Sequence, residues 1–254
     1  MTEQENKEKD YLLNVYKDKL PSDNPFIILA GPDKEMFVIG GDDELVNNLD
    51  LLTQYRSLYD TVLDLDSKIS FSLKQAIENA YSDEVINGFD AMSVSSIQEW
   101  MSYYFVENAL FRIEAMWDIL AQIFNLKYSI GLDKAKVYHN RLFSNKVENI
   151  SRYWNGKLPN EVSKIVDYFN EEDDDSIEDG MWKGNYKFVN SLRNDMTHKI
   201  SISMNSFSTY AFSLKKHPSY IIKRVSECYS KLEEFICEAV EDIEENCDDF
   251  ISFE

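Results

Sequence analysis

The chain has 254 residues, of which 44% are hydrophobic and 13% aromatic, enough for the packed core of one elaborated domain or two small ones. It contains no run of about 18 apolar residues and no apolar stretch near Met1, so we expect neither a membrane span nor a signal peptide, and a cytoplasmic protein. The formal net charge of −20 at pH 7 argues against nonspecific nucleic-acid binding, which depends on clustered cations.

The negative charge is concentrated in two segments. Residues 171–179 carry seven acids and residues 233–254 carry ten, and neither segment contains Lys or Arg. The rest of the chain is therefore close to neutral, and local basic groups could still contact phosphate, although we expect most of them on solvated faces and loops. These groups are Lys134, Lys136 and Arg141, and further along Lys215, Lys216, Lys223 and Arg224.

The first 43 residues predict a short helix and a β-hairpin. Residues 4–20 have a composition that a helix would accept. Apolar runs at 26–29 and 36–39 flank the turn residues 31–34, a pattern typical of a hairpin. We therefore treat residues 1–43 as an N-terminal extension of the domain that follows.

From residue 44 to residue 254 the apolar spacing predicts one helical domain. A first long helix is expected over residues 43–80, with an apolar stripe that should pack on other helices. The stripe consists of Leu45, Leu49, Leu52, Tyr55, Leu58, Val62 and Leu65.

A second long helix is predicted over residues 95–126, with Ser93 or Ser95 as its N-cap. A polar stripe of acids and amides runs along it beside the apolar one, and it could line a polar cleft or form an ordinary wet face. The predicted buried side comprises Ile97, Trp100, Met101, Tyr104, Ile113, Met116, Trp117, Leu120 and Ile123, and the second stripe comprises Glu107, Phe111, Glu114, Asp118, Gln122 and Asn125.

The remaining segments complete an all-α, antiparallel bundle of long helices. The acidic residues 170–180 are expected to form a mobile loop, because like charges at this density repel a compact arrangement. Cys228, Cys237 and Cys247 fall on the last helix, too far apart to bridge, and are read as reduced thiols. Helices are predicted near 134–143, 147–154, 160–169, 181–196 and 218–248, the last ending in an acidic C-terminal tail.

The chain has three histidines, His139, His198 and His217. His198 lies in the stretch Ser191–His198, together with Arg193, at the end of a predicted helix. This is the one stretch that combines a phosphate-binding cation, small polar groups and an imidazole that titrates near neutral pH. We expect the other two histidines to be surface or helix-capping groups.

The stretch resembles the signature of the HEPN superfamily, which consists of compact all-α proteins. That signature is an Arg, commonly a small polar residue, and then a His; Arg193, Asn194 and His198 match it, with four residues between Arg and His. The motif falls on a late bundle helix, where the superfamily carries it. The upstream segment 108–122 also looks like the preceding long helix of standalone bacterial members, so that the resemblance covers about residues 44–248.

The resemblance implies a metal-independent endoribonuclease without a cofactor, acting on RNA at a cleft formed by a homodimer. RNA supplies its own nucleophile, the 2′-hydroxyl, so cleavage needs a group to take its proton, a cation for the phosphate and an acid for the leaving oxygen. His198 would be the general base or acid, Arg193 the phosphate clamp and Asn194 an orienting donor. Glu114 is a weaker candidate for orienting Arg193 or His198. Superfamily members often act as toxins or in phage defence, which would imply an antitoxin partner.

Helical geometry restricts this hypothesis. Five steps from Arg193 to His198 rotate the side-chain direction by roughly 140°, so an unbroken helix would point the two side chains apart. Either the helix ends before His198 or each cleft combines residues of two subunits. Asn194 and His198, four residues apart, would share a face.

Other functions remain open from the sequence. Arg193 and His198 near a helix C-terminus interact favourably with the helix dipole and can cap carbonyls without a catalytic role. The chain could then be a catalytically inactive HEPN-like module that binds a nucleotide or a protein, or an acidic dimeric interaction protein. We expect no metal site, because no Glu-x-x-His pair accompanies Glu114 and Asp118.

Overall fold

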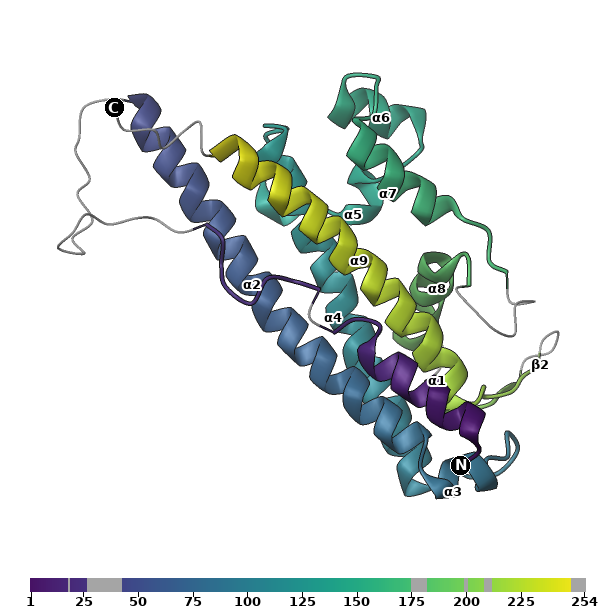
Figure 1. Ribbon diagram of the computed structural model, residues 1–254. Coiled ribbons are helices and arrows are strands. Elements are labelled where there is room, and N and C mark those ends of the chain that lie inside the picture. Colours follow the sequence, from purple (N-terminus) through teal and green to yellow (C-terminus); the bar gives the residue numbers. More distant parts are fainter. Residues whose placement is uncertain (18, 27–42, 175–181, 199–200, 208–211, 248–254) are drawn as a thin grey trace.

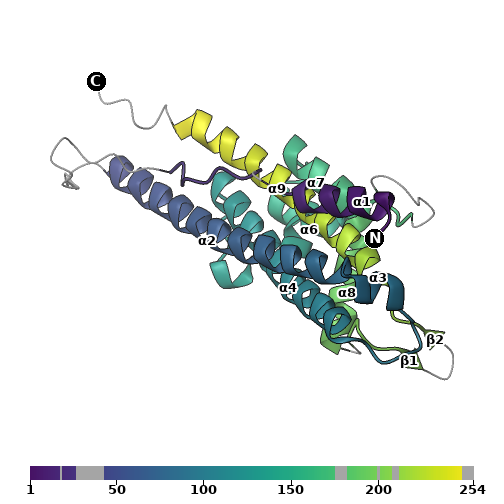
Figure 2. The same ribbon diagram turned by 60° about the horizontal axis from the view of Figure 1, so that its bottom comes forward.

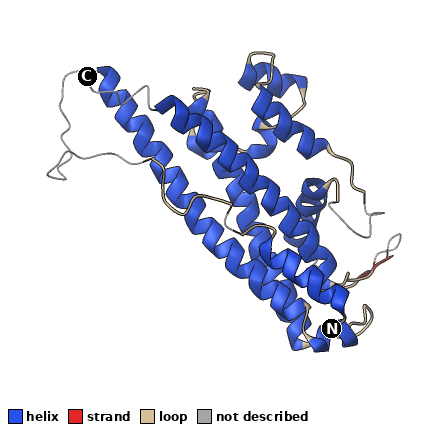
Figure 3. Cartoon of the chain, in the orientation of Figure 1, coloured by secondary structure: helices blue, strands red, loops and turns tan. Residues whose placement is uncertain are grey.

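The structure, a computed structural model, is a bundle of helices and confirms the all-α prediction (Figures 1 and 3). The predicted β-hairpin at 26–39 lies, apart from Phe26, outside the described part of the chain. The structure describes residues 1–17, 19–26, 43–174, 182–198, 201–207 and 212–247.

Three long helices run side by side along the length of the molecule (Figures 1 and 2). The chain passes along α2, turns through the short helix α3 and returns along α4, so that α2 and α4 are antiparallel neighbours. The long helix α9 comes back from the same end as α4 and packs against both. The bounds are Asp43–Ala80 for α2, Asp83–Gly88 for α3, Ile97–Lys127 for α4 and Pro218–Cys247 for α9.

The last helix, α9, is the centre of the bundle. Every residue from 221 to 230 is buried, because α2, α4 and α8 (Asn185–His198) contact α9 while α1 (Glu3–Asn14) closes a further side. The α1 contact is visible in the hydrogen bond from Tyr11 Oη to Glu227 Oε1, at 3.3 Å. A helix enclosed on all sides must find partners for its charged side chains within the protein.

Two predicted surface cations are therefore internal. Arg224 has no exposed surface and pairs with Asp173 at 2.5 Å, while Lys215 pairs with Glu99 at 2.6 Å. The prediction of solvated positions was wrong for these two and for Lys223, which is 8% exposed. Burial of a charge is tolerated here because each buried head group meets a carboxylate or an aromatic ring. The prediction of a solvated position is confirmed for Lys134, Lys136, Arg141 and Lys216, which are exposed.

Helix α4 begins at Ile97, two residues after the predicted start, and its N-cap is one residue after the predicted Ser95. Ser96 is its N-cap and accepts a hydrogen bond from Glu99 N at 3.2 Å, whereas Ser95 donates to the Glu99 carboxylate. The predicted buried side is confirmed for the C-terminal half, where Trp117 lies among five aromatic rings. These rings belong to His139, Tyr168, Phe169, Tyr186 and Phe235.

The N-terminal half of α4 turns a different face inward. Ile97, Trp100 and Tyr104 are 76%, 52% and 46% exposed, so their prediction as core residues was wrong. The adjacent face, with Tyr103 and Val106, is buried instead. The sequence contains apolar residues on both faces here, and only the position of α2 decides which face is covered.

Short elements connect α4 to α8. The acidic residues that begin the predicted mobile loop are anchored in their described part: Glu172 pairs with Lys187 at 2.8 Å and Asp173 with Arg224. A Cβ on Gly184, which has a φ of +71°, would lie 2.5 Å from the backbone of Asp173, so only Gly permits this crossing. The elements between α4 and α8 are the 3-10 helix η1 (Lys134–Lys136), α5 (His139–Leu142), α6 (Val147–Trp154) and α7 (Asn160–Asn170). After α8 the chain forms a pair of strands that the sequence analysis did not predict, β1 (Ser206–Phe207) and β2 (Phe212–Ser213).

Within the described ranges, none of the helices combines the length and apolar character needed to cross a bilayer.

Candidate functional site

The whole Arg-His motif lies on α8, which is one continuous helix to its last residue, His198. His198 is exposed, whereas Arg193 is half-buried. Because the helix is unbroken, the two side chains leave it in directions roughly 140° apart. The structure therefore does not bring Arg193 and His198 together within one chain.

Asn194 lies between the two and holds the arginine. Arg193 Nη1 donates to Asn194 Oδ1 at 3.1 Å, and Asn194 Nδ2 donates to Asn190 Oδ1 at 3.4 Å. The buried Nε of Arg193 has no hydrogen-bond partner among the described residues. The guanidinium therefore has an N–H donor without a partner in the described part of the chain, and burial of an unpaired donor lowers the stability of the fold.

Two carboxyl groups of α4, those of Glu114 and Asp118, lie near enough to this arginine for its charge to act on both. Burial raises the pKa of Glu114, and the nearby charges of His139 and Arg193 only partly offset this. Burial also acts to raise the pKa of Asp118, but hydrogen bonds from His139 outweigh it, and with the charge of Arg193 they hold that pKa below its ordinary value. The predicted candidates Arg193, Asn194 and Glu114 consequently share one region.

Helices α4 and α8 run antiparallel along this region. Further towards the α4 N-terminus, Ser201 Oγ donates to Glu107 Oε1 at 2.8 Å. The second stripe of α4 is hence largely in contact with protein: besides its two central acids, Asn125 exchanges hydrogen bonds with the backbone of Leu132. Phe111 is the exposed exception, at 48%.

His139 is 5% exposed, so the prediction that it is a surface or helix-capping group was wrong. Its Nδ1 lies 2.6 Å from Asp118 Oδ1, its Nε2 lies 3.1 Å from Tyr186 Oη, and Glu114 Oε2 is 3.7 Å from Nε2. The ring is enclosed by the aromatic rings of Trp117, Phe169 and Tyr186. No motif spacing could reveal this histidine, since the three segments meet only through the packing of α4, α5 and α8.

The other sequence candidates have structural roles. His217 precedes α9, and its Nδ1 accepts a hydrogen bond from Ser219 N at 3.2 Å, which confirms the predicted capping role. Trp182 and Tyr186 are buried at 8% and 6% exposure, which confirms them as packing residues. Cys228 is buried and free, and Cys237 is half-buried and free.

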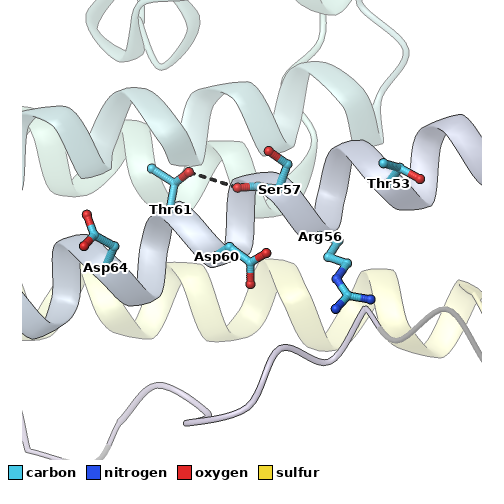
Figure 4. Close-up of a pocket in the computed structure, with 6 residues that line it drawn as sticks. All are labelled: Thr53, Arg56, Ser57, Asp60, Thr61 and Asp64. Carbon is cyan, nitrogen blue, oxygen red and sulfur yellow. Dashed lines mark hydrogen bonds between the residues drawn. The ribbon is translucent and has the colours of Figure 1, made fainter.

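A hollow on the described surface lies elsewhere, on the outer face of α2 (Figure 4). It has a volume of about 480 Å³ and carries one cation, Arg56, beside two acids. Thr61 Oγ1 donates to Ser57 O within it, at 2.9 Å. Its side chains come from a single helix, and it is open to solvent, so it offers no converging groups for chemistry. The lining residues are Thr53, Arg56, Ser57, Asp60, Thr61 and Asp64.

Among the described residues, no group of three or more His, Cys, Asp and Glu side chains is arranged to hold a metal ion. No protein-family model, curated protein or solved structure matches the chain.

Proposed function

We propose that the chain is a metal-independent endoribonuclease of the HEPN type, whose cleft combines Arg193 and Asn194 of one copy with His198 of a second copy. The observation that carries the proposal is the unbroken course of α8 through the motif: it leaves His198 exposed while Arg193 is half-buried. An imidazole free to meet substrate and a guanidinium with unused donors are the two groups that cleavage through the 2′-hydroxyl needs.

Each group has a defined role in this proposal. Arg193 binds the scissile phosphate through charge-assisted hydrogen bonds, for which its planar guanidinium is suited. Asn194 fixes the guanidinium through Oδ1. His198 takes the proton of the 2′-hydroxyl or supplies one to the leaving oxygen, and the products carry 2′,3′-cyclic phosphate ends.

A face for the second copy lies beside the motif. Ile97, Trp100, Tyr104 and Phe111 follow one another at helical spacing on α4 and are all exposed. The hydrogen bond from Ser201 to Glu107 places Ser201, three residues after the end of α8, beside this part of α4. Aromatic side chains in a contiguous exposed patch are typical of protein interfaces, and a two-fold axis there would place each His198 near the other chain.

The test is cleavage of a mixed RNA pool in EDTA by the wild type and by the variants His198→Ala, Arg193→Ala and Asn194→Ala. We expect cutting that survives chelation, that is lost in the first two variants and that leaves cyclic phosphate ends. Arg141→Ala is the matched control, since Arg141 is an exposed cation that stacks on Tyr138 and is not part of the motif. Absence of cutting by every form, across varied RNAs, would refute the nuclease and favour the binding module.

Mixing two inactive variants tests the shared cleft. A dimer of one Arg193→Ala chain and one His198→Ala chain contains one intact cleft if the groups come from different copies, and none if they come from the same copy. An equimolar mixture that exchanges freely should regain about a quarter of the wild-type activity. A mixture that exchanges but stays inactive would contradict the composite cleft.

Trp100→Asp places a charge in the proposed dimer face, so this variant should sediment as a monomer and should not cut RNA.

A further inference from the structure

A buried hydrogen-bonded chain joins three helices beside the Arg-His motif. Asp118 on α4, His139 at the start of α5 and Tyr186 on α8 are linked through the two nitrogens of the imidazole. Asp118 Oδ1 also accepts from the backbone N of His139, at 3.0 Å. None of the three residues belongs to the Arg-His motif, and packing alone would not require a polar chain in this place.

The order of donors in this chain follows from its chemistry. The carboxylate of Asp118 can only accept, so Nδ1 of His139 carries a proton. Burial raises the pKa of Tyr186 well above its ordinary value, so the phenol keeps its proton, and its Oη lies 3.1 Å from Nε2 of His139. These two partners fix the orientation of the His139 ring.

The same hydrogen-bonded chain ends on α8, the helix that carries Arg193. Tyr186 and Arg193 are seven residues apart, two turns of α8, and therefore point from the same face. Asp118 and Glu114 are one turn apart on α4; burial raises the pKa of Glu114, hydrogen bonds from His139 outweigh burial and lower that of Asp118, and the charge of Arg193 acts to lower both. One oxygen of Glu114, Oε1, is buried without a hydrogen-bond partner among the described residues, as is Nε of Arg193.

We propose that His139 is a positioning residue of the Arg193 site: held between Asp118 and Tyr186, it fixes α8, which carries Arg193, relative to Glu114 and Asp118 on α4. This inference rests on the proposed function, since Arg193 is the phosphate clamp only there. His139 does not touch substrate, because it is 5% exposed. It acts by orienting Asp118 through Nδ1 and α8 through Tyr186.

The chain offers variants that remove single links. Tyr186→Phe deletes only the hydroxyl and keeps the ring that stacks on Phe169 at 3.6 Å between centroids. His139→Asn keeps a donor near the position of Nδ1 and loses the contact to Tyr186, whereas His139→Ala loses both. His217→Ala is the matched control, because this histidine is also partly buried but caps α9 instead.

The first measurement does not depend on catalysis. The Nε–H signal of Arg193 is assigned in a proton–nitrogen NMR spectrum by its loss in Arg193→Lys. We expect this signal to shift in His139→Ala and in Tyr186→Phe, to shift less in His139→Asn, and to stay in place in His217→Ala. If His139→Ala does not fold, the Tyr186→Phe variant still decides the question.

The second measurement is RNA cleavage by the same variants. Displacement of a reacting group by about an ångström reduces turnover by up to a hundredfold, so we expect kcat to fall by about tenfold to a hundredfold in His139→Ala, with partial recovery in His139→Asn. A shifted Arg193 signal without cutting by any form supports the positioning role and counts against the nuclease. An unmoved Arg193 signal in folded His139→Ala and Tyr186→Phe overturns the inference, whatever the activity.

Discussion

Glu233, buried in the middle of α9, should make this protein less stable at neutral pH than it would be with an uncharged side chain. Its side chain is 1% exposed, and its Oε2 has no hydrogen-bond partner among the described residues. Burial, reinforced by the negative charge of Asp66, raises its pKa from 4.5 to about 9, against a smaller opposite effect of Lys19. We predict that Glu233→Gln stabilises the fold.

The magnitude follows from the linkage between proton binding and folding. The folded chain keeps the proton of Glu233 up to about pH 9, whereas the unfolded chain releases it near pH 4.5, so unfolding releases a proton between these values. Each pH unit above 4.5 then lowers the free energy of unfolding by about 1.4 kcal/mol, and the loss at pH 7 is about 3 kcal/mol. The Gln variant, which has no proton to release, avoids this loss.

The assay is urea unfolding of both proteins at several pH values between 5.5 and 8. The free-energy difference between variant and wild type should widen by about 1.4 kcal/mol per pH unit, and this slope is independent of any constant cost of the amide. A difference that stays constant across the range would refute the reasoning, because it would mean that Glu233 is ionised in the folded state.

Glu234→Gln is the matched control on the neighbouring residue. Its side chain is 44% exposed and pairs with Lys19 and Lys231 at 3.0 and 2.7 Å. Burial acts to raise its pKa, but the hydrogen bonds from the two lysines outweigh burial and lower the pKa. Its contribution is therefore complete above about pH 4.5, so the variant should lose a little stability by an amount that does not change between pH 5.5 and 8.

Three further predictions concern the bundle. Lys215→Ala leaves the Glu99 carboxylate buried without its partner and should cost about 3–5 kcal/mol in urea unfolding, and a cost below 1 kcal/mol would mean that water reaches the carboxylate. Ser96→Ala removes the N-cap of α4 and should lower the free energy of unfolding by about 1 kcal/mol, whereas an unchanged value would show that another group caps the helix. An alkylating reagent should modify Cys237 before Cys228, as followed by peptide mass analysis. Burial raises the pKa of the Cys237 thiol to about 11 and that of the Cys228 thiol to about 12, and Cys228 is fully buried. Modification in the reverse order would contradict the burial of Cys228.

Local periodicity was sufficient for most of the helices. The long helices α2 and α9 begin and end close to the predicted residues, since apolar residues that repeat with a period near 3.6 indicate a helix directly. Pro218 at the first position of α9 was also informative, because Pro fits the first turn. The N-terminal half of α4 shows the limit: Trp100 and Tyr103 are both apolar candidates, and their spacing does not say which one a neighbour covers.

The sequence by itself determined the helical class, the order of the helices and the place of the Arg-His motif on α8, because each of these depends on residues close together in the chain. Tertiary structure alone decided that Arg193 lies near Glu114 and Asp118, that Arg224 is internal and that His139 joins Asp118 to Tyr186. The physical reason is distance along the chain: His139 is 21 residues from Asp118 and 47 from Tyr186. A buried polar contact of this kind depends on how three helices pack, which no local pattern encodes.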